Sequence, residues 1–187
     1  MDNASVVASL ILHARNTREN HQAVIDRSLA HFLGDWRDAD TGLLHQAMDA
    51  RVGKPTDRAR ASGTALGAVL LAYAERDVSR QLFHSLQSRC TRSFMGFGYI
   101  NEYPDDAHGP GDVDSGPLIF SISPSGCAFS LAAARAFDDR DAFVRLYRTA
   151  HLMGTPVDVS GRRTYVTGGP LGNAILLAML TTLPDLP

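Results

Sequence analysis

The feature that most constrains the fold of this chain is an internal repeat. The segment SGTALGAVLLAYAERDVSRQLF, which starts at Ser62, resembles SGCAFSLAAARAFDDRDAFVRLY, which starts at Ser125. The offset is 63 residues (from 62 to 125), and one insertion then aligns Arg76-Asp77 with Arg140-Asp141. Each copy predicts a helix rich in small residues, a tight acidic turn and a second, amphipathic helix.

Helical patterns extend to both sides of this repeat. Apolar spacing predicts helices over residues 5–15 and 21–36, and residues 168–180 repeat the small-residue start of a third, partial copy. Alternating residues at 157–159 and 164–166, around Ser160-Gly161, predict at most one small β-hairpin. We therefore expect an all-α fold in a single domain over residues 1–187.

Antiparallel helical hairpins in series form either a solenoid or a closed α/α toroid. A period of 63 residues is longer than those of the common helical solenoids, and long loops between copies favour the toroid. In a toroid such loops gather at one end and form a site. The interior of the ring is expected to hold that site.

Net charge, apolar content and cysteine usage limit the kinds of partner and the location that we expect. A net charge of −2 gives no argument for nucleic acid, and no apolar run approaches the roughly 20 residues that span a bilayer. Cys90 and Cys127 occur without a secretory leader, which predicts two free thiols and a cytoplasmic location. We expect a small-molecule substrate, no nucleic acid and no membrane span.

The loop of residues 94–125 is the strongest functional candidate, because long irregular loops are often functional. Its sequence concentrates carboxylates, aromatic residues and glycines. A catalytic interpretation assigns acid/base chemistry to Asp114, Glu102 and Asp112. The alternative is ordinary turn and capping chemistry, in which Asp side chains accept backbone N–H groups. The same loop supplies three candidate substrate-binding residues, Tyr99, Tyr103 and His108.

Three further residues complete the predicted binding set. Arg58 precedes the first copy and could bind an anionic substrate, or it or Arg60 could pair with Asp112 or Asp114. Cys127 could line a cavity from an inner helix, or be a buried and inert thiol. Asn173 could reach a ligand from its helix.

Other polar motifs give weaker signals. His45 is either structural or an acid/base group. TGGPLGNAI, at residues 167–175, lacks the Lys and Ser/Thr of a phosphate-binding loop and predicts a helix start. No spacing matches a common metal signature, so we expect neither a metal nor a cofactor.

Three segments together resemble a family. They are GFGYINEYP, the stretch from GDVDSGP to HLMGTP, and TGGPLGNAILLAML. They are similar to bacterial proteins of (α/α)6-toroid architecture related to linalool dehydratase-isomerase, over about residues 40–180. The resemblance implies a central pocket suited to acid/base chemistry with carboxylate, tyrosine, histidine and cysteine groups.

The chain is short for such a ring, because six hairpins at this spacing need more residues than its 187. The resemblance therefore implies the C-terminal part of a larger toroid, a degenerate ring, or half of a ring completed by another chain. Apolar edges of an incomplete ring predict a homo-oligomer.

Two functions follow as hypotheses. The first is an enzyme that performs hydration/dehydration or isomerisation of a small alcohol or terpenoid-like substrate, or a glycoside-hydrolase-like reaction. The second is a non-catalytic helical scaffold or binding module. A structure in which Asp112 and Asp114 spend their oxygens on backbone N–H groups and arginines would favour the second.

Overall fold

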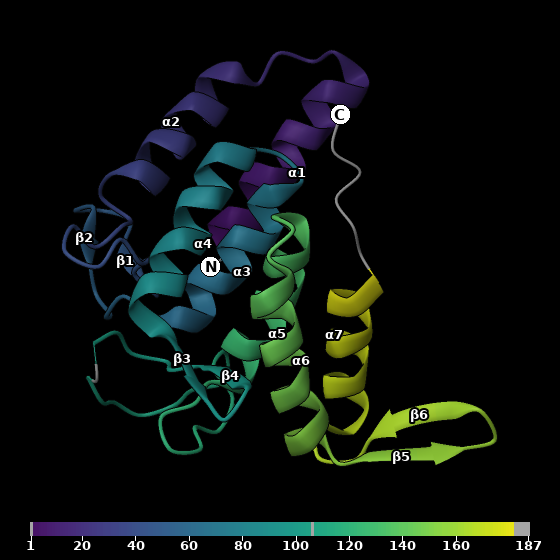
Figure 1. Ribbon diagram of the computed structural model, residues 1–187. Coiled ribbons are helices and arrows are strands. Elements are labelled where there is room, and N and C mark those ends of the chain that lie inside the picture. Colours follow the sequence, from purple (N-terminus) through teal and green to yellow (C-terminus); the bar gives the residue numbers. More distant parts are fainter. Residues whose placement is uncertain (1, 106, 182–187) are drawn as a thin grey trace.

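The computed structural model describes residues 2–105 and 107–181 (Figure 1). The helices are α1 (Asp2–Thr17), α2 (Gln22–Leu33), α3 (Ala61–Ala72), α4 (Arg76–Cys90), α5 (Pro124–Ala136), α6 (Arg140–Gly154) and α7 (Gly169–Thr181). The strands are β1 (Met48–Asp49), β2 (Lys54–Pro55), β3 (Thr91–Phe94), β4 (Phe97–Ile100), β5 (Pro156–Val159) and β6 (Arg162–Tyr165). They pair as the antiparallel hairpins β1–β2, β3–β4 and β5–β6.

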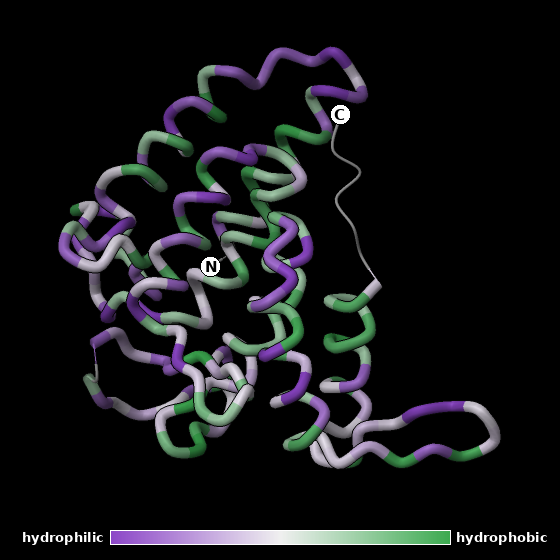
Figure 2. The backbone as a smooth tube through the Cα atoms, in the orientation of Figure 1, coloured by the Kyte–Doolittle hydropathy of each residue, from purple (hydrophilic) through white to green (hydrophobic). Residues whose placement is uncertain are grey.

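The helices pack in two layers. Helices α1, α3, α5 and α7 form a row in which each packs against the next. Helix α2 packs on α1, α4 on α3, and α6 on α5, so that the second helix of each pair covers the first. Figure 2 shows the consequence: α3, α5 and α7 are largely hydrophobic, whereas α2, α4 and α6 carry polar residues along one side.

The internal repeat is confirmed as two helical pairs, α3–α4 and α5–α6, each followed by a β-hairpin. The first pair, α1–α2, precedes β1–β2 in the same order, so the unit of two helices and a hairpin occurs three times before α7. Predicted helix 5–15 corresponds to the longer α1. Predicted helix 21–36 corresponds to α2, which ends before Gly34.

The all-α toroid expected from the sequence is wrong. The described residues form seven helices and three antiparallel β-hairpins, which makes a small mixed domain of helices and strands. The hairpin predicted around Ser160-Gly161 is confirmed as β5–β6, which extends away from the helices in Figure 1. The other two hairpins are additional.

The two unpredicted hairpins have weak sequence signals for physical reasons. Strands β1 and β2 have two residues each, too few for an alternating pattern. Strands β3 and β4 are joined by Met95 and Gly96, which have φ of 48° and 83°. A two-residue turn with both φ positive is usually Asn-Gly or Asp-Gly, and Met-Gly does not carry that signal.

Small side chains let α3 lie at the centre of the core. Ten of its residues are buried, and a Cβ added at Gly67 would lie 2.8 Å from Cδ1 of Leu44. Gly67 therefore lets α3 pack closely on the loop that carries Leu44 without displacing that side chain. That loop, with the loop after β4, forms the site described below.

None of the described helices combines the length and the apolar content that a bilayer crossing would need.

Candidate functional site

Glu102 is fully buried and contacts the start of α3. Its carboxylate accepts the Ser62 hydroxyl at 2.6 Å and the Ser62 N–H at 3.3 Å, and its carbonyl accepts the N–H of Ala61. Burial raises the pKa of Glu102, while hydrogen bonds from Ser123 and Ser62 and the charge of Arg60 oppose that rise. Ser123 is also the N-cap of α5, accepting the N–H of Gly126.

The start of α3 has no capping side chain of its own, because its N-cap residue is Arg60. It stands at the N-cap of α3, where its side chain makes no capping hydrogen bond, whereas α5 has Ser123 at the corresponding position. Glu102 thus supplies to α3 the acceptor that α3 lacks. Glu102, which the sequence suggested as a catalytic acid, thus bonds through its carboxylate and its carbonyl to the first residues of α3.

Asp112 is committed to a turn and to an ion pair. Its Oδ1 accepts the N–H groups of Asp114 and Ser115 at 3.0 and 2.9 Å, and its Oδ2 lies 2.7 Å from Nη1 of Arg60. Burial alone would raise the pKa of Asp112, but the Ser115 N–H and the Arg60 guanidinium lower it overall. Arg60 is itself buried and also pairs with Asp57. The predicted alternative of an Arg60–Asp112 pair is confirmed.

Asp114 faces a different neighbour. It is exposed, and its Oδ2 accepts the side-chain N–H of Gln46 at 2.8 Å. The carboxylates of Asp112 and Asp114 therefore bind different side chains, Arg60 and Gln46. Neither residue lines either of the two cavities described below. The three predicted catalytic carboxylates have different surroundings: Glu102 contacts the start of α3, Asp112 pairs with Arg60, and Asp114 lies at the surface.

An open cleft has a volume of about 540 Å³. It is lined by residues from three segments, 38–45, 55–59 and 103–107, the last of which belongs to the long loop of residues 94–125. This volume is within the usual range for small-molecule sites. Apolar walls come from Pro55, Ala59, Pro104 and Ala107. Polar groups come from Asp38, Thr41, His45, Asp57, Arg58 and Tyr103.

Arg58 and Tyr103 are the predicted binding residues that line this cleft. The Arg58 guanidinium carbon lies 5.2 Å from the centroid of the Tyr103 ring, and Arg58 donates to the carbonyl of His108 at 3.0 Å. Tyr103 donates its hydroxyl to the carbonyl of Pro110 at 2.8 Å. Both side chains are thereby held in place, and the Arg58 guanidinium has five N–H groups in all with which it can donate.

His45 is the polar residue that sequence reasoning underrated. It lines the cleft and also a second cavity of about 80 Å³, together with Gln46, Trp36 and Leu44. Its Nδ1 is buried, and among the described residues it has no hydrogen-bond partner. The Oε1 of Gln46 is in the same condition. Buried polar atoms without partners are rare, and they mark positions where water or a ligand binds.

Asp38 gives His45 an acidic neighbour in the same cleft. The Thr41 hydroxyl, at 2.7 Å, is the largest cause that lowers the pKa of Asp38; burial opposes it, and the charge of His45 lowers it further. A carboxylate and an imidazole in one cleft can position and transfer a proton.

The remaining predicted residues lie outside the cleft. Cys127 is buried, its sulfur accepts the N–H of Ile100 at 3.3 Å, and burial raises its pKa to about 12. Tyr99 packs half-buried against the core from β4. Asn173 accepts the N–H of Tyr165 and donates to its carbonyl, which joins β6 to α7. His108 is exposed, and its Nδ1 lies 3.1 Å from the hydroxyl of Ser121.

No protein-family model matches this chain, and a search of curated proteins gives no significant match.

Proposed function

We propose that this chain binds a small hydroxylated molecule with an apolar body in the cleft, and that His45 is the residue that contacts its hydroxyl group. The observation that carries this proposal is the buried Nδ1 of His45, which has no partner among the described residues and lies beside the cleft. A ligand oxygen would satisfy that nitrogen.

The walls of the cleft support this ligand class. Proline and alanine side chains offer an apolar surface, and Thr41, Arg58 and Tyr103 surround it with polar groups. Arg60 forms an ion pair with Asp57, and the other charged residues of the lining, Asp38 and Arg58, have opposite signs. The cleft is therefore not strongly acidic or strongly basic. A neutral alcohol with a hydrocarbon body suits such a lining better than a multiply charged anion.

We propose acid/base chemistry as the reaction class, in agreement with the resemblance to proteins related to linalool dehydratase-isomerase. For a dehydration, His45 as the imidazolium would donate a proton to the hydroxyl, which leaves as water when the C–O bond breaks, and the neutral imidazole would then accept the proton lost from the adjacent carbon. Asp38 would stabilise the imidazolium. Dehydration or isomerisation of a terpenoid-like alcohol fits this arrangement. In this assignment His45 and Asp38 take the roles that the sequence suggested for Glu102, Asp112 and Asp114.

A non-catalytic binding module is the second candidate. The geometry of Asp112 favours it, because that carboxylate spends its oxygens on backbone N–H groups and on Arg60. The two candidates share the cleft and differ in whether a proton is transferred there.

The test is calorimetric titration of geraniol, and separately of glucose, into the full chain. We expect geraniol to bind and His45→Gln to weaken it by at least about tenfold, which corresponds to about 1.4 kcal/mol. His84→Gln, an exposed histidine on α4, is the matched control and should bind like the wild type. Glucose binding in place of geraniol would favour the carbohydrate alternative, and binding of neither would reject the proposed ligand class.

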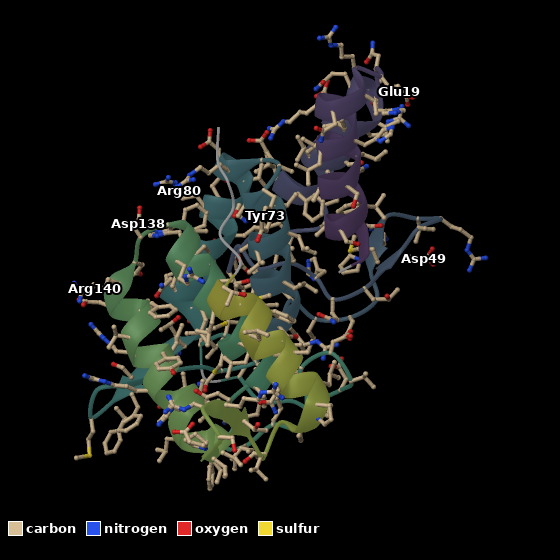
Figure 3. The ribbon with its side chains drawn as sticks, turned by 90° about the vertical axis from the view of Figure 1, so that its right-hand side faces the viewer. Glu19, Asp49, Tyr73, Arg80, Asp138 and Arg140 are labelled. Carbon is tan, nitrogen blue, oxygen red and sulfur yellow. The ribbon has the colours of Figure 1, made fainter. Side chains whose placement is uncertain are left out.

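We also propose self-association through α7 and a cytoplasmic location. Helix α7 packs on α5 and against β6, and Figure 3 shows it at the front of the molecule without a helix over it. Its Leu171 and Leu177 side chains are 73% and 63% exposed, and a second copy would cover them. Two buried free thiols support a reducing compartment.

A further inference from the structure

The turn between α1 and α2 brings together two imidazoles and a carboxylate far from the cleft. His13 Nε2 lies 3.2 Å from Glu19 Oε2, and His21 Nε2 lies 3.1 Å from the same oxygen. Figure 3 labels Glu19 at the end of the molecule, where the α1–α2 hairpin turns. Among the described residues this is the one group of His, Cys, Asp and Glu with three ligand atoms within 4.8 Å of one another.

The chain reverses sharply to build this group. His13 lies on the last turns of α1, and Arg18 adopts a φ of 62°, in the left-handed region. The N–H of Glu19 then donates to the hydroxyl of Thr17, so that Glu19 and His21 come back beside His13. The two imidazole centroids are 5.7 Å apart.

We propose that His13, Glu19 and His21 form a site for a divalent transition metal ion of the Zn²⁺ type. Imidazole nitrogens together with one carboxylate suit Zn²⁺, Co²⁺ or Ni²⁺, whereas Ca²⁺ and Mg²⁺ prefer oxygen ligands throughout. Ligand atoms on a tetrahedral Zn²⁺ with bonds near 2.0–2.1 Å are about 3.4 Å apart. The two N···O separations here are already within a few tenths of an ångström of that value.

Competition for one oxygen also fits a metal site. Both imidazoles approach Oε2 of Glu19, so a cation between the three groups would replace two hydrogen bonds on one atom by three coordinate bonds. The neighbouring Arg15 does not compete for this position, because its guanidinium donates to the carbonyls of Tyr73 and Ala74.

Three protein ligands leave one tetrahedral position for water. All three side chains are at least one-third exposed, so the ion exchanges with solvent directly. The bound ion ties the end of α1 to the approach to α2. It therefore acts as a clamp on the first helical pair, separate from the chemistry of the cleft.

Titration of ZnCl₂ into the full chain tests this site, with Co²⁺ absorption as a second, spectroscopic readout. We expect one bound Zn²⁺, a rise in the thermal unfolding midpoint, and at least about tenfold weaker binding in His13→Gln and in His21→Gln. His84→Gln is the matched control and should bind like the wild type. Circular dichroism without metal shows whether each variant keeps its helices.

Two results would overturn the proposal. One is equal Zn²⁺ affinity in the wild type and in folded His13→Gln and His21→Gln. The other is no saturable binding in the wild type at concentrations up to about 1 mM, which corresponds to about −4 kcal/mol.

Discussion

The hydroxyl of Ser62 donates to Oε1 of Glu102 across 2.6 Å, inside the core. The same carboxylate accepts the backbone N–H of Ser62 at 3.3 Å and so supplies the start of α3 with an acceptor. The partial positive charge at a helix start favours an anion there. A buried side chain from the long loop therefore holds the start of the first repeat copy.

The buried state of Glu102 predicts a specific pH dependence. Because burial raises its pKa above 4.5, the folded state holds the proton more tightly than the unfolded state. Stability therefore falls as pH rises from about 4.5 through the folded pKa. Glu102→Gln should remove this fall, measured as the free energy of unfolding in urea from about pH 4 to about pH 8.

Glu75→Gln is the control for that series, since Glu75 makes no side-chain capping contact at α4. Glu102→Ala should cost about 1–3 kcal/mol at neutral pH, because it leaves Ser62 without its buried partner. An unchanged pH profile in Glu102→Gln would contradict the structural role assigned here.

Asp112 and Asp114 form a matched pair for a second prediction. Asp112→Asn should destabilise the chain by about 1 kcal/mol, because it weakens the pair with the buried Arg60 and the bonds from the N–H groups of Asp114 and Ser115, while the Asp112 side chain is 36% exposed and Arg60 keeps Asp57 as a partner. Asp114→Asn should change stability by less than about 0.5 kcal/mol, because its carboxylate bonds to the uncharged Gln46 side chain at the surface. Chemical denaturation measures both, and equal costs would argue against this division.

The pKa of Asp112 adds a pH test for the same pair. Its folded pKa is lowered, so the stability that it contributes is present above the ordinary value near 3.8 and is lost as pH falls through the folded pKa. Acid unfolding should accordingly be less steep in Asp112→Asn than in the wild type.

Both cysteines should be inert in the folded protein. Burial raises the pKa of Cys90 and of Cys127 to about 12, so almost no thiolate exists near pH 8. A thiol-reactive disulfide reagent should modify the native chain far more slowly than a free thiol, and two equivalents should react after denaturation. Rapid native modification of Cys127 would restore the cavity-lining interpretation of that residue.

The helical pairs could be predicted from the sequence, whereas the position of the site could not. The dipeptide Ser62-Gly63 recurs as Ser125-Gly126, and the repeat that starts with it predicted the two helices α3 and α5. The roles of Glu102 and Asp112 depend on Ser62, Ser123 and Arg60, which lie far away along the chain. Spacing alone does not disclose such contacts.

The same limit explains His45. His45 stands out because its buried Nδ1 has no hydrogen-bond partner among the described residues and because the residue lines two cavities. Neither burial nor a cavity can be read from the sequence alone. Arg58 and Tyr103 could be predicted because Arg58 directly precedes the first repeat copy and Tyr103 lies in the long loop of residues 94–125. Their meeting at 5.2 Å required the fold.

Self-association gives a further prediction. Light scattering after gel filtration should report a mass above the 20.2 kDa of one chain. Leu171→Glu should shift the protein toward monomer, because it places a charge on the exposed side of α7. Val52→Glu, an exposed position between β1 and β2, is the control. A wild-type monomer at all concentrations would reject the proposed contact.

The central claim is that the cleft around His45 is the functional site, and amide NMR during titration with geraniol tests it most directly. We predict that the largest shifts fall on residues 38–45, 55–59 and 103–107, and that they weaken in His45→Gln. Shifts concentrated on residues 112–116 in a wild type that binds geraniol, and kept in full by His45→Gln, would contradict the account.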